Sequence, residues 1–299
     1  MTATATPARR TAPARASRGL WRDALARLTR NGPALLGMFF IVVFVLAAVL
    51  APVISPYDPI AGSLANRLQA PGTAGHVLGT DLQGRDELTR ILYGARISLQ
   101  VGVISVIMGL AIGGTLGAIA GAFGGAVDNV LMRIVDVLLA IPALFIFIYL
   151  ATVIRPTIGI LIGILSLIGW LGPARLVRGE TLSLRTREYV QAVRVMGGRS
   201  WRVVLRHIVP NTIGTIVVNA TFQIADAILV LATLSFLGFG LPPPAVNWGG
   251  MLSNGVSYSA DGYWWLIYPA GIMIILTVIA FNFIGDALRD ALEVRLQQR

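Results

Sequence analysis

The chain has 299 residues, of which 56% are hydrophobic and 13% are charged, and its mean hydropathy is +0.75. A soluble domain carries about 25% charged residues, so this composition excludes an ordinary soluble protein and is typical of a membrane protein. The formal net charge of +10 does not by itself indicate nucleic-acid binding, and the lack of cysteine excludes disulfides and thiolate metal sites.

The N-terminal segment is rich in Ala, Thr, Pro and Arg and has no apolar period, so we expect residues 1–30 to form a disordered basic tail. A secretory signal is the competing interpretation, because a basic start precedes an apolar run. The run from Pro33 to Ile54 is longer than a signal core of about 7–15 residues. It predicts a retained first transmembrane helix over 31–55.

Several apolar segments, each flanked by charged residues, follow one another along the chain. A span needs about 20 apolar residues to cross the hydrocarbon core. The sequence therefore predicts an all-α, multi-pass protein of the prokaryotic cell membrane, in contact with membrane lipid, whose five later spans form a core over 96–290. The six expected spans are 32–55, 97–122, 129–152, 156–176, 208–238 and 264–286.

The distribution of arginine predicts the orientation of these spans. If the N-terminus is cytoplasmic, most of the 24 basic residues lie inside, as the positive-inside rule requires. Both termini, including residues 291–299, are then expected to be cytoplasmic. A polar insert at 56–95 and a Pro/Gly-rich loop at 239–263 are expected on the outer face.

The outer insert contains Thr80 and Gln83 at the spacing of a capping box. This pattern predicts a short helix carrying Asp81, Arg85, Asp86 and Arg90. Two interpretations stay open: an internally paired helix on the membrane, or an outer-face contact for a partner protein. We include Asp81, Arg85, Asp86 and Trp248 among the candidate outer-face contacts.

The second span carries glycine at every fourth position, Gly109, Gly113, Gly117 and Gly121. Small residues at this spacing let helix backbones approach closely in lipid, so we expect this ridge to pack against another helix. Gly159 and Gly163 repeat the pattern more weakly in the fourth span. In the third span, Asp136 lies one turn from Arg133, which predicts a local ion pair.

A basic cytoplasmic loop at 186–207 follows the fourth span. Its first part, 187–196, predicts a short amphipathic helix in which Val190, Val193 and Met196 share an apolar stripe. Gly197-Gly198 is expected to end this helix, and Ser200 to cap the next one. The narrow apolar stripe suits a groove in a partner protein better than a lipid surface.

The fifth span carries a polar stripe. Its members are three or four residues apart and therefore share one helical face. Polar groups facing lipid are costly, so this face should line a translocation pathway or pack against a neighbouring helix. The stripe comprises Thr212, Thr215, Asn219, Gln223 and Asp226.

Several catalytic motifs are missing: the sequence has no phosphate-binding loop with a lysine, no HExxH and no GxSxG. With two histidines and no cysteine, a metal site is not expected. We therefore do not expect an enzyme.

The segments "EYVQAVRVMGG" and "HIVPN" resemble the EAA loop of ATP-binding-cassette importer permeases. Gln191, Ala192 and Val193 occupy the three starting positions, where Gln191 and Val193 depart from the family's Glu-Ala-Ala, and Gly197 and Pro210 match the glycine and the proline. The resemblance implies that this loop, with Glu188 and Arg194, is the coupling helix that docks on an ATPase subunit.

Three further segments are similar to the second permease of the dipeptide, oligopeptide and nickel subfamily: "HVLGTDLQGRDELTRILYGARISL", "LSFLGFGLPPPAVNWGGML" and "NFIGDALRDALEVRL". The resemblance implies a type I importer permease fold and a pathway shared with a homologous second permease. It also implies two ATPase subunits that hold ATP and Mg, and an extracytoplasmic substrate-binding protein, while this chain binds no cofactor.

The substrate stays open at this stage. The resemblance favours di- and oligopeptides, while nickel, glutathione or oligosaccharide are alternatives carried by similar permeases. A stand-alone secondary transporter is a further alternative, but the expected internal repeat between the two halves is not evident.

Overall fold

The computed structural model describes residues 28–196 and 204–296, and within these ranges the chain is built from helices without a β-strand. The prediction of an all-α protein is confirmed. Five helical segments are long and apolar enough to cross a membrane, and a sixth is obtained if a bent helix pair counts as one span.

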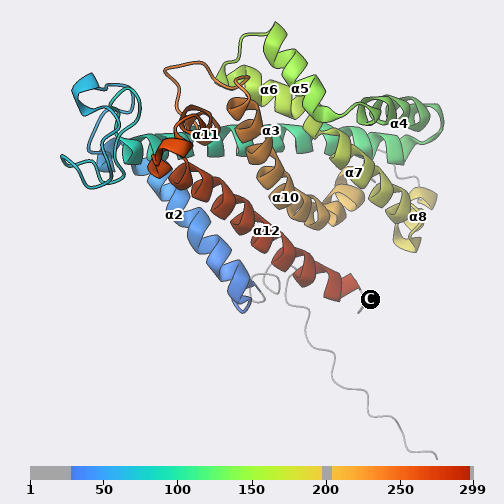
Figure 1. Cartoon of the computed structure of the whole chain (residues 1–299). Coiled ribbons are helices and arrows are strands. Elements are labelled where there is room, and N and C mark those ends of the chain that lie inside the picture. The colour runs from blue at the N-terminus through green and yellow to red at the C-terminus, as the bar shows by residue number, and fades with distance from the viewer. Residues whose placement is uncertain (1–27, 197–203, 297–299) are drawn as a thin grey trace, which may run out of the picture.

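The long helices lie at angles to one another, and α2 and α12 run side by side (Figure 1). They are α2 (Gly32–Ile54), α3 (Glu87–Phe123), α6 (Ile158–Gly169), α7 (Leu171–Leu184), α10 (Val209–Phe236) and α12 (Tyr268–Leu296). Shorter elements are η1 (Leu64–Asn66), α4 (Gly125–Ala140), α5 (Ala143–Val153), α8 (Glu188–Val195), η2 (Val204–Ile208), α11 (Trp248–Val256), η3 (Ser259–Asp261) and η4 (Trp264–Leu266).

The expected third span, 129–152, is not one straight helix. It is formed by α4 and α5, which meet at Ile141 and Pro142 with a bend of 84°. Proline has no N–H to donate to the preceding turn and disfavours helical geometry in the residue before it, which accounts for a break at this position.

The expected fourth span, 156–176, is also longer and divided. The residues form α6 and α7, which are separated at Trp170 and together make one candidate span from Ile158 to Leu184. Arg178, which lies beyond the expected span, is therefore part of α7 together with Arg175.

The main hydrophobic core gathers residues from five helices. Phe44 of α2, Ile91 of α3, Ile228 of α10, Trp248 of α11 and Ile274 of α12 are buried together. A second core cluster joins α3, α5, α6 and α10 through Val101, Phe147, Leu161 and Leu231.

The outer surface of the helices is strongly apolar. Phe39 and Val53 of α2, Phe145 of α5 and Ile275 of α12 are more than half exposed. Apolar side chains on the outside of long helices are expected where lipid is the solvent, which agrees with a membrane-embedded chain.

The glycine ridge of α3 packs as expected. A Cβ added at Gly113 would lie 2.9 Å from Pro173 Cβ and still closer to Trp170 O, and one at Gly121 would lie 2.6 Å from Thr181 Cβ. The ridge therefore lets α3 and α7 approach backbone to backbone. The weaker pattern in α6 differs, since nothing in the described part of the chain lies within 4 Å of a Cβ at Gly159 or Gly163.

Candidate functional site

The polar stripe of the fifth span lies in the middle and first half of α10. Thr212 is buried, Thr215, Asn219 and Gln223 are partly buried, and Asp226 is exposed. The side-chain oxygens of Asn219 and Gln223 are buried without a hydrogen-bond partner in the described residues. These two buried oxygens are therefore available to accept a hydrogen bond from a ligand or another subunit.

A cavity of about 190 Å³ opens beside this stripe and brings Gln223 and Asp226 together. Its other walls are mainly apolar and come from α3, α5, α6 and α10, including Phe147, Leu165 and Val230. The amide nitrogen of Gln223 donates to Gly169 O at 3.3 Å, which turns its carbonyl oxygen away from that contact. Thr215 and Asn219 do not line this cavity.

Thr215 instead lies beside Glu180, a half-buried acid of α7. Glu180 is not among the residues predicted from the sequence, because it lies beyond the expected end of the fourth span at residue 176. The extension of α7 to Leu184 brings this carboxyl group beside the start of the polar stripe.

The basic loop begins with α8, which confirms the short helix expected over 187–196 to within a residue at either end. Glu188, Gln191 and Ala192 are exposed, and Val193 is partly buried. The Gln191 amide donates to Thr186 O at 3.1 Å, which fixes the start of α8 against the end of α7.

The apolar stripe of α8 is buried only in part. Val190 is fully buried against Ile208, with Val193 and Leu184 alongside. Met196 does not join this contact and is 78% exposed, and Val195 is also exposed. Thus Val190 packs on the chain itself, whereas the Val195 and Met196 side chains are exposed.

Three further coupling-loop candidates are Pro210, Arg194 and Gly197. Pro210 lies at the start of α10, where a missing N–H costs no helical hydrogen bond. The backbone of Arg194 belongs to α8, but its side chain is outside the described part. Gly197, with the expected break at Gly197-Gly198 and the Ser200 cap, lies outside the described residues.

Two ion pairs join α7 to α4, the helix that precedes the bend. Arg178 donates to both carboxylate oxygens of Asp128, with an Nη2–Oδ2 distance of 2.6 Å. Arg175 Nη2 lies 2.5 Å from Asp136 Oδ1. The expected pair between Asp136 and Arg133 is therefore wrong, because the divided fourth span places Arg175 beside Asp136.

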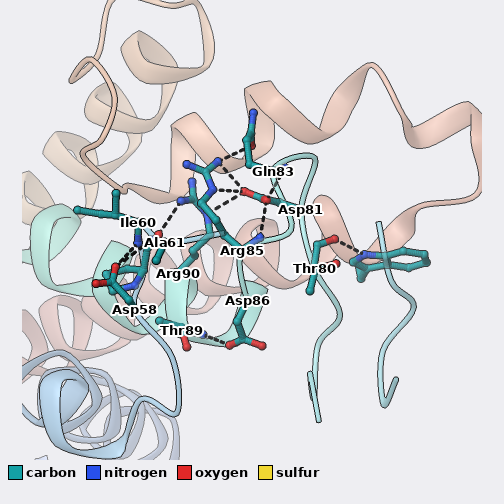
Figure 2. Close-up of polar contacts among 12 residues, drawn as sticks. Asp58, Ile60, Ala61, Thr80, Asp81, Gln83, Arg85, Asp86, Thr89 and Arg90 are labelled. Atoms are coloured by element: carbon teal, nitrogen blue, oxygen red, sulfur yellow. Dashed lines mark hydrogen bonds and ion pairs between the residues drawn. The ribbon is translucent and has the colours of Figure 1, made fainter. Parts of the chain in front are cut away.

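A cluster of charged side chains holds the outer insert against the start of α3 (Figure 2). Asp81 accepts from Arg85 Nε at 2.7 Å and from the backbone N–H groups of Gln83 and Arg85 at 2.8 and 2.9 Å. Arg90 Nε lies 3.4 Å from the same carboxylate, and Arg90 Nη1 donates to Pro59 O at 3.0 Å. These contacts tie three separate segments together.

A neighbouring turn of the insert is fixed by Asp58, which lies near this cluster (Figure 2). Its carboxylate accepts from the backbone N–H groups of Ile60 and Ala61 at 2.7 and 3.0 Å. These two hydrogen bonds lower the pKa of the Asp58 carboxyl below its ordinary value.

The capping-box prediction at Thr80 is wrong. Residues 80–86 form turns, and α3 begins only at Glu87, with Asp86 as its N-cap and Thr89 N–H as the donor at 2.8 Å. The Thr80 hydroxyl instead donates to Asn66 O, and its backbone oxygen accepts from Trp265 Nε1 at 3.2 Å. Gly84, with φ of +71°, permits the turn that takes the place of the expected helix.

Of the four candidate outer-face residues, three are buried in the chain. Asp81 belongs to the cluster above, and Asp86 lies 2.9 Å from His76 Nδ1 while capping α3. Trp248 is fully buried and donates to Ile91 O at 3.1 Å. These three residues therefore make contacts within the chain, and Arg85 is the one of the four that remains partly exposed.

This arrangement of apolar helices, a packed glycine ridge, a polar stripe on α10 and the exposed amphipathic helix α8 is that of a transport permease. Residues 113–298 match the model of the binding-protein-dependent transport system inner membrane component family. The chain belongs to this family and is a multi-pass inner-membrane protein with the permease fold. Residues 19–71 match the N-terminal transmembrane domain of oligopeptide transport permease C.

Curated relatives cover nearly the whole chain. It is 39% identical to the dipeptide transport system permease protein DppC of Bacillus subtilis over 93% of this chain and 86% of that protein. It is 40% identical to the oligopeptide transport system permease protein OppC of Escherichia coli K12, over 92% of this chain and 91% of that protein. The similarity therefore includes the insert, the polar stripe and the coupling loop.

Proposed function

We propose that this chain is one of two homologous permease subunits of an ATP-driven importer for di- and oligopeptides. Similarity to dipeptide and oligopeptide permeases over more than nine-tenths of the chain supports the substrate class. Two ATPase subunits carry ATP and Mg, and an extracytoplasmic protein delivers the peptide. Both termini are cytoplasmic in this proposal, which follows from the arginine distribution.

The observation that carries the peptide assignment is the cavity beside α10. It combines the Asp226 carboxylate with apolar walls from Phe147, Leu165 and Val230. A carboxylate and a buried amide oxygen at Gln223 are hydrogen-bond acceptors and suit the ammonium group of a peptide N-terminus. The apolar walls suit the side chain beside that ammonium, which varies among peptides.

Coupling to the ATPases is assigned to α8. Val195 at the end of α8 and the adjacent Met196 present an exposed apolar face, and Gln191 and Ala192 are exposed as well. An amphipathic helix that presents such a face fits a hydrophobic groove on a partner. Its inner face stays attached to the permease through Val190.

Replacement of Asp226 by Asn tests the pathway assignment. In cells or proteoliposomes carrying the complete importer, we expect Asp226→Asn to lower uptake of peptides with a free N-terminus by about tenfold. A charge-assisted hydrogen bond contributes about 1.5–3 kcal/mol, and 1.4 kcal/mol corresponds to a factor of ten. Uptake of N-acetylated peptides should change little.

The matched control is Asp261→Asn, which removes a carboxylate from the exposed turn η3, away from the cavity. This variant should transport normally. If Asp226→Asn takes up every tested peptide at the wild-type rate, Asp226 does not bind substrate.

A further inference from the structure

A second and larger cavity, of about 370 Å³, lies at the end of α5, away from the stripe just described. It is enclosed by Arg155, which follows α5, by the 238–245 loop after α10, and by the first turns of α11. Arg90, beside the outer insert, forms part of its wall. The cavity is therefore on the same side of the molecule as the insert.

The cavity is positively charged. Arg90 and Arg155 line it, and no Asp or Glu is among its described lining residues. Arg90 is buried and already held by Pro59 O and Asp81, whereas Arg155 is exposed and has no ion-pair or hydrogen-bond partner in the ranges that the structure covers. Arg155 is thus a free cation at the rim of a cavity.

Two further features favour an anion in this cavity. The first turn of α11 faces it through Asn247 and Gly250, and a helix N-terminus carries a partial positive charge. Ser235, at the end of α10, is 5% exposed, lines the cavity and has a buried hydroxyl without a hydrogen-bond partner in the described chain. A buried unpaired hydroxyl is a donor available to a ligand.

We propose that this cavity binds the α-carboxylate of the transported peptide, with Arg155 as the main contact and Ser235 as a second donor. This proposal rests on the proposed peptide importer function. It adds a binding site for the C-terminal carboxylate of the peptide, whose N-terminal ammonium group is assigned to Asp226. A guanidinium can donate two parallel hydrogen bonds to a carboxylate, which suits a terminal carboxyl group.

The position relative to Asp226 agrees with a zwitterionic substrate. The two cavities follow each other along the same helices, with Phe147 and Asp226 in one and Ala151 and Ser235 in the other. The rise along α10 from Asp226 to Ser235 is about 13 Å at 1.5 Å per residue. An extended peptide of about four residues has a similar length.

The test compares a short peptide with its C-terminal amide. In proteoliposomes containing the complete importer and its binding protein, uptake of the two forms is measured for wild type and for Arg155→Gln. We expect Arg155→Gln to lower the acid-to-amide uptake ratio by about tenfold. Any preference of the binding protein is common to both measurements and cancels in the comparison of ratios.

Two further variants sharpen this comparison. Arg155→Lys keeps the positive charge and should retain most of the preference for the acid. Arg67→Gln removes an exposed arginine of the outer insert that does not line the cavity, and it should leave the ratio unchanged.

An unchanged ratio in Arg155→Gln, with peptide uptake intact, would overturn the carboxylate site while leaving the peptide function standing. An equal loss of acid and amide uptake would also overturn it and would indicate occupation by another anion, such as a lipid phosphate, or a role in docking. A wild-type importer that takes up neither form would overturn both proposals.

Discussion

Arg178 of α7 and Asp128 of α4 form a two-point ion pair, with the Nη2–Oδ2 distance at 2.6 Å. It joins the helix that leads into α8 to the helix that precedes the 84° bend. The residues are 50 positions apart in the chain, so the pair is a tertiary link rather than a local helix contact.

This pair should contribute more to stability than its neighbour, Arg175 with Asp136. The side chains of Arg178 and Asp128 are 34% and 11% exposed, against 51% and 53% for the second pair. In double-mutant cycles with alanine, we expect a coupling free energy of about 1 kcal/mol for the first pair and close to zero for the second. The measurement is unfolding of the purified protein in mixed micelles, and equal couplings would contradict the expectation.

A second prediction concerns the contact between α3 and α7. Gly113→Val should destabilise the protein by about 1–3 kcal/mol, because its Cβ would collide with Trp170 O and Pro173 Cβ. The control is Gly114→Val, one residue further on, where nothing lies within 4 Å of an added Cβ. The two variants share the same change of helix propensity, so their difference in melting temperature reports the helix contact.

If the two valine variants melt at the same temperature, the close approach of α3 and α7 does not limit stability. The opposite order would mean that the surface near Gly114 is covered by another part of the assembled importer.

The third prediction tests the exposed face of α8. Ala192→Phe should leave folding unchanged because Ala192 is exposed, yet it should obstruct docking of α8 on an ATPase. We expect ATP hydrolysis to become uncoupled from peptide uptake, with transport per ATP lowered about tenfold or more. Gly197→Val, the corresponding change beyond the described end of α8, is expected to have the same effect.

A suitable control for α8 is Thr186→Val, an exposed position just before the helix, which should transport nearly normally. Normal import by Ala192→Phe would remove the coupling assignment from this helix.

The fold class and most spans were predictable because hydrocarbon thickness sets helix length and because charged residues mark the ends of spans. The α3 glycine ridge was predictable for a similar reason, since spacing alone puts Gly113 and Gly117 on one face. By contrast, the break at Pro142 was not predicted, because the hydropathy of an apolar segment does not distinguish a straight helix from a bent one.

The contacts of charged residues were the least predictable. Asp136 was expected to pair within its own helix, but its partner is Arg175, which only the packing of α7 brings close. Asp86 was expected inside a short helix that begins at Thr80, but it is the N-cap of α3. The expected helix is absent because Thr80 is hydrogen-bonded to Asn66 and Trp265. Trp248 is likewise buried through its contact with α3, and the residues next to it in the sequence do not indicate this contact.

The Val190–Ile208 contact attaches α8 to the rest of the chain by side-chain packing, in addition to the connecting backbone. Ile208 directly precedes α10, so α8 rests on the base of the helix that carries Gln223 and Asp226. A force applied to the outer side of α8 is therefore transmitted through a close-packed apolar contact, which resists compression. Since α10 is a continuous helix of 28 residues, Ile208 at its base and Ser235 near its far end belong to one rigid element, so a tilt of this helix moves both cavities' walls together.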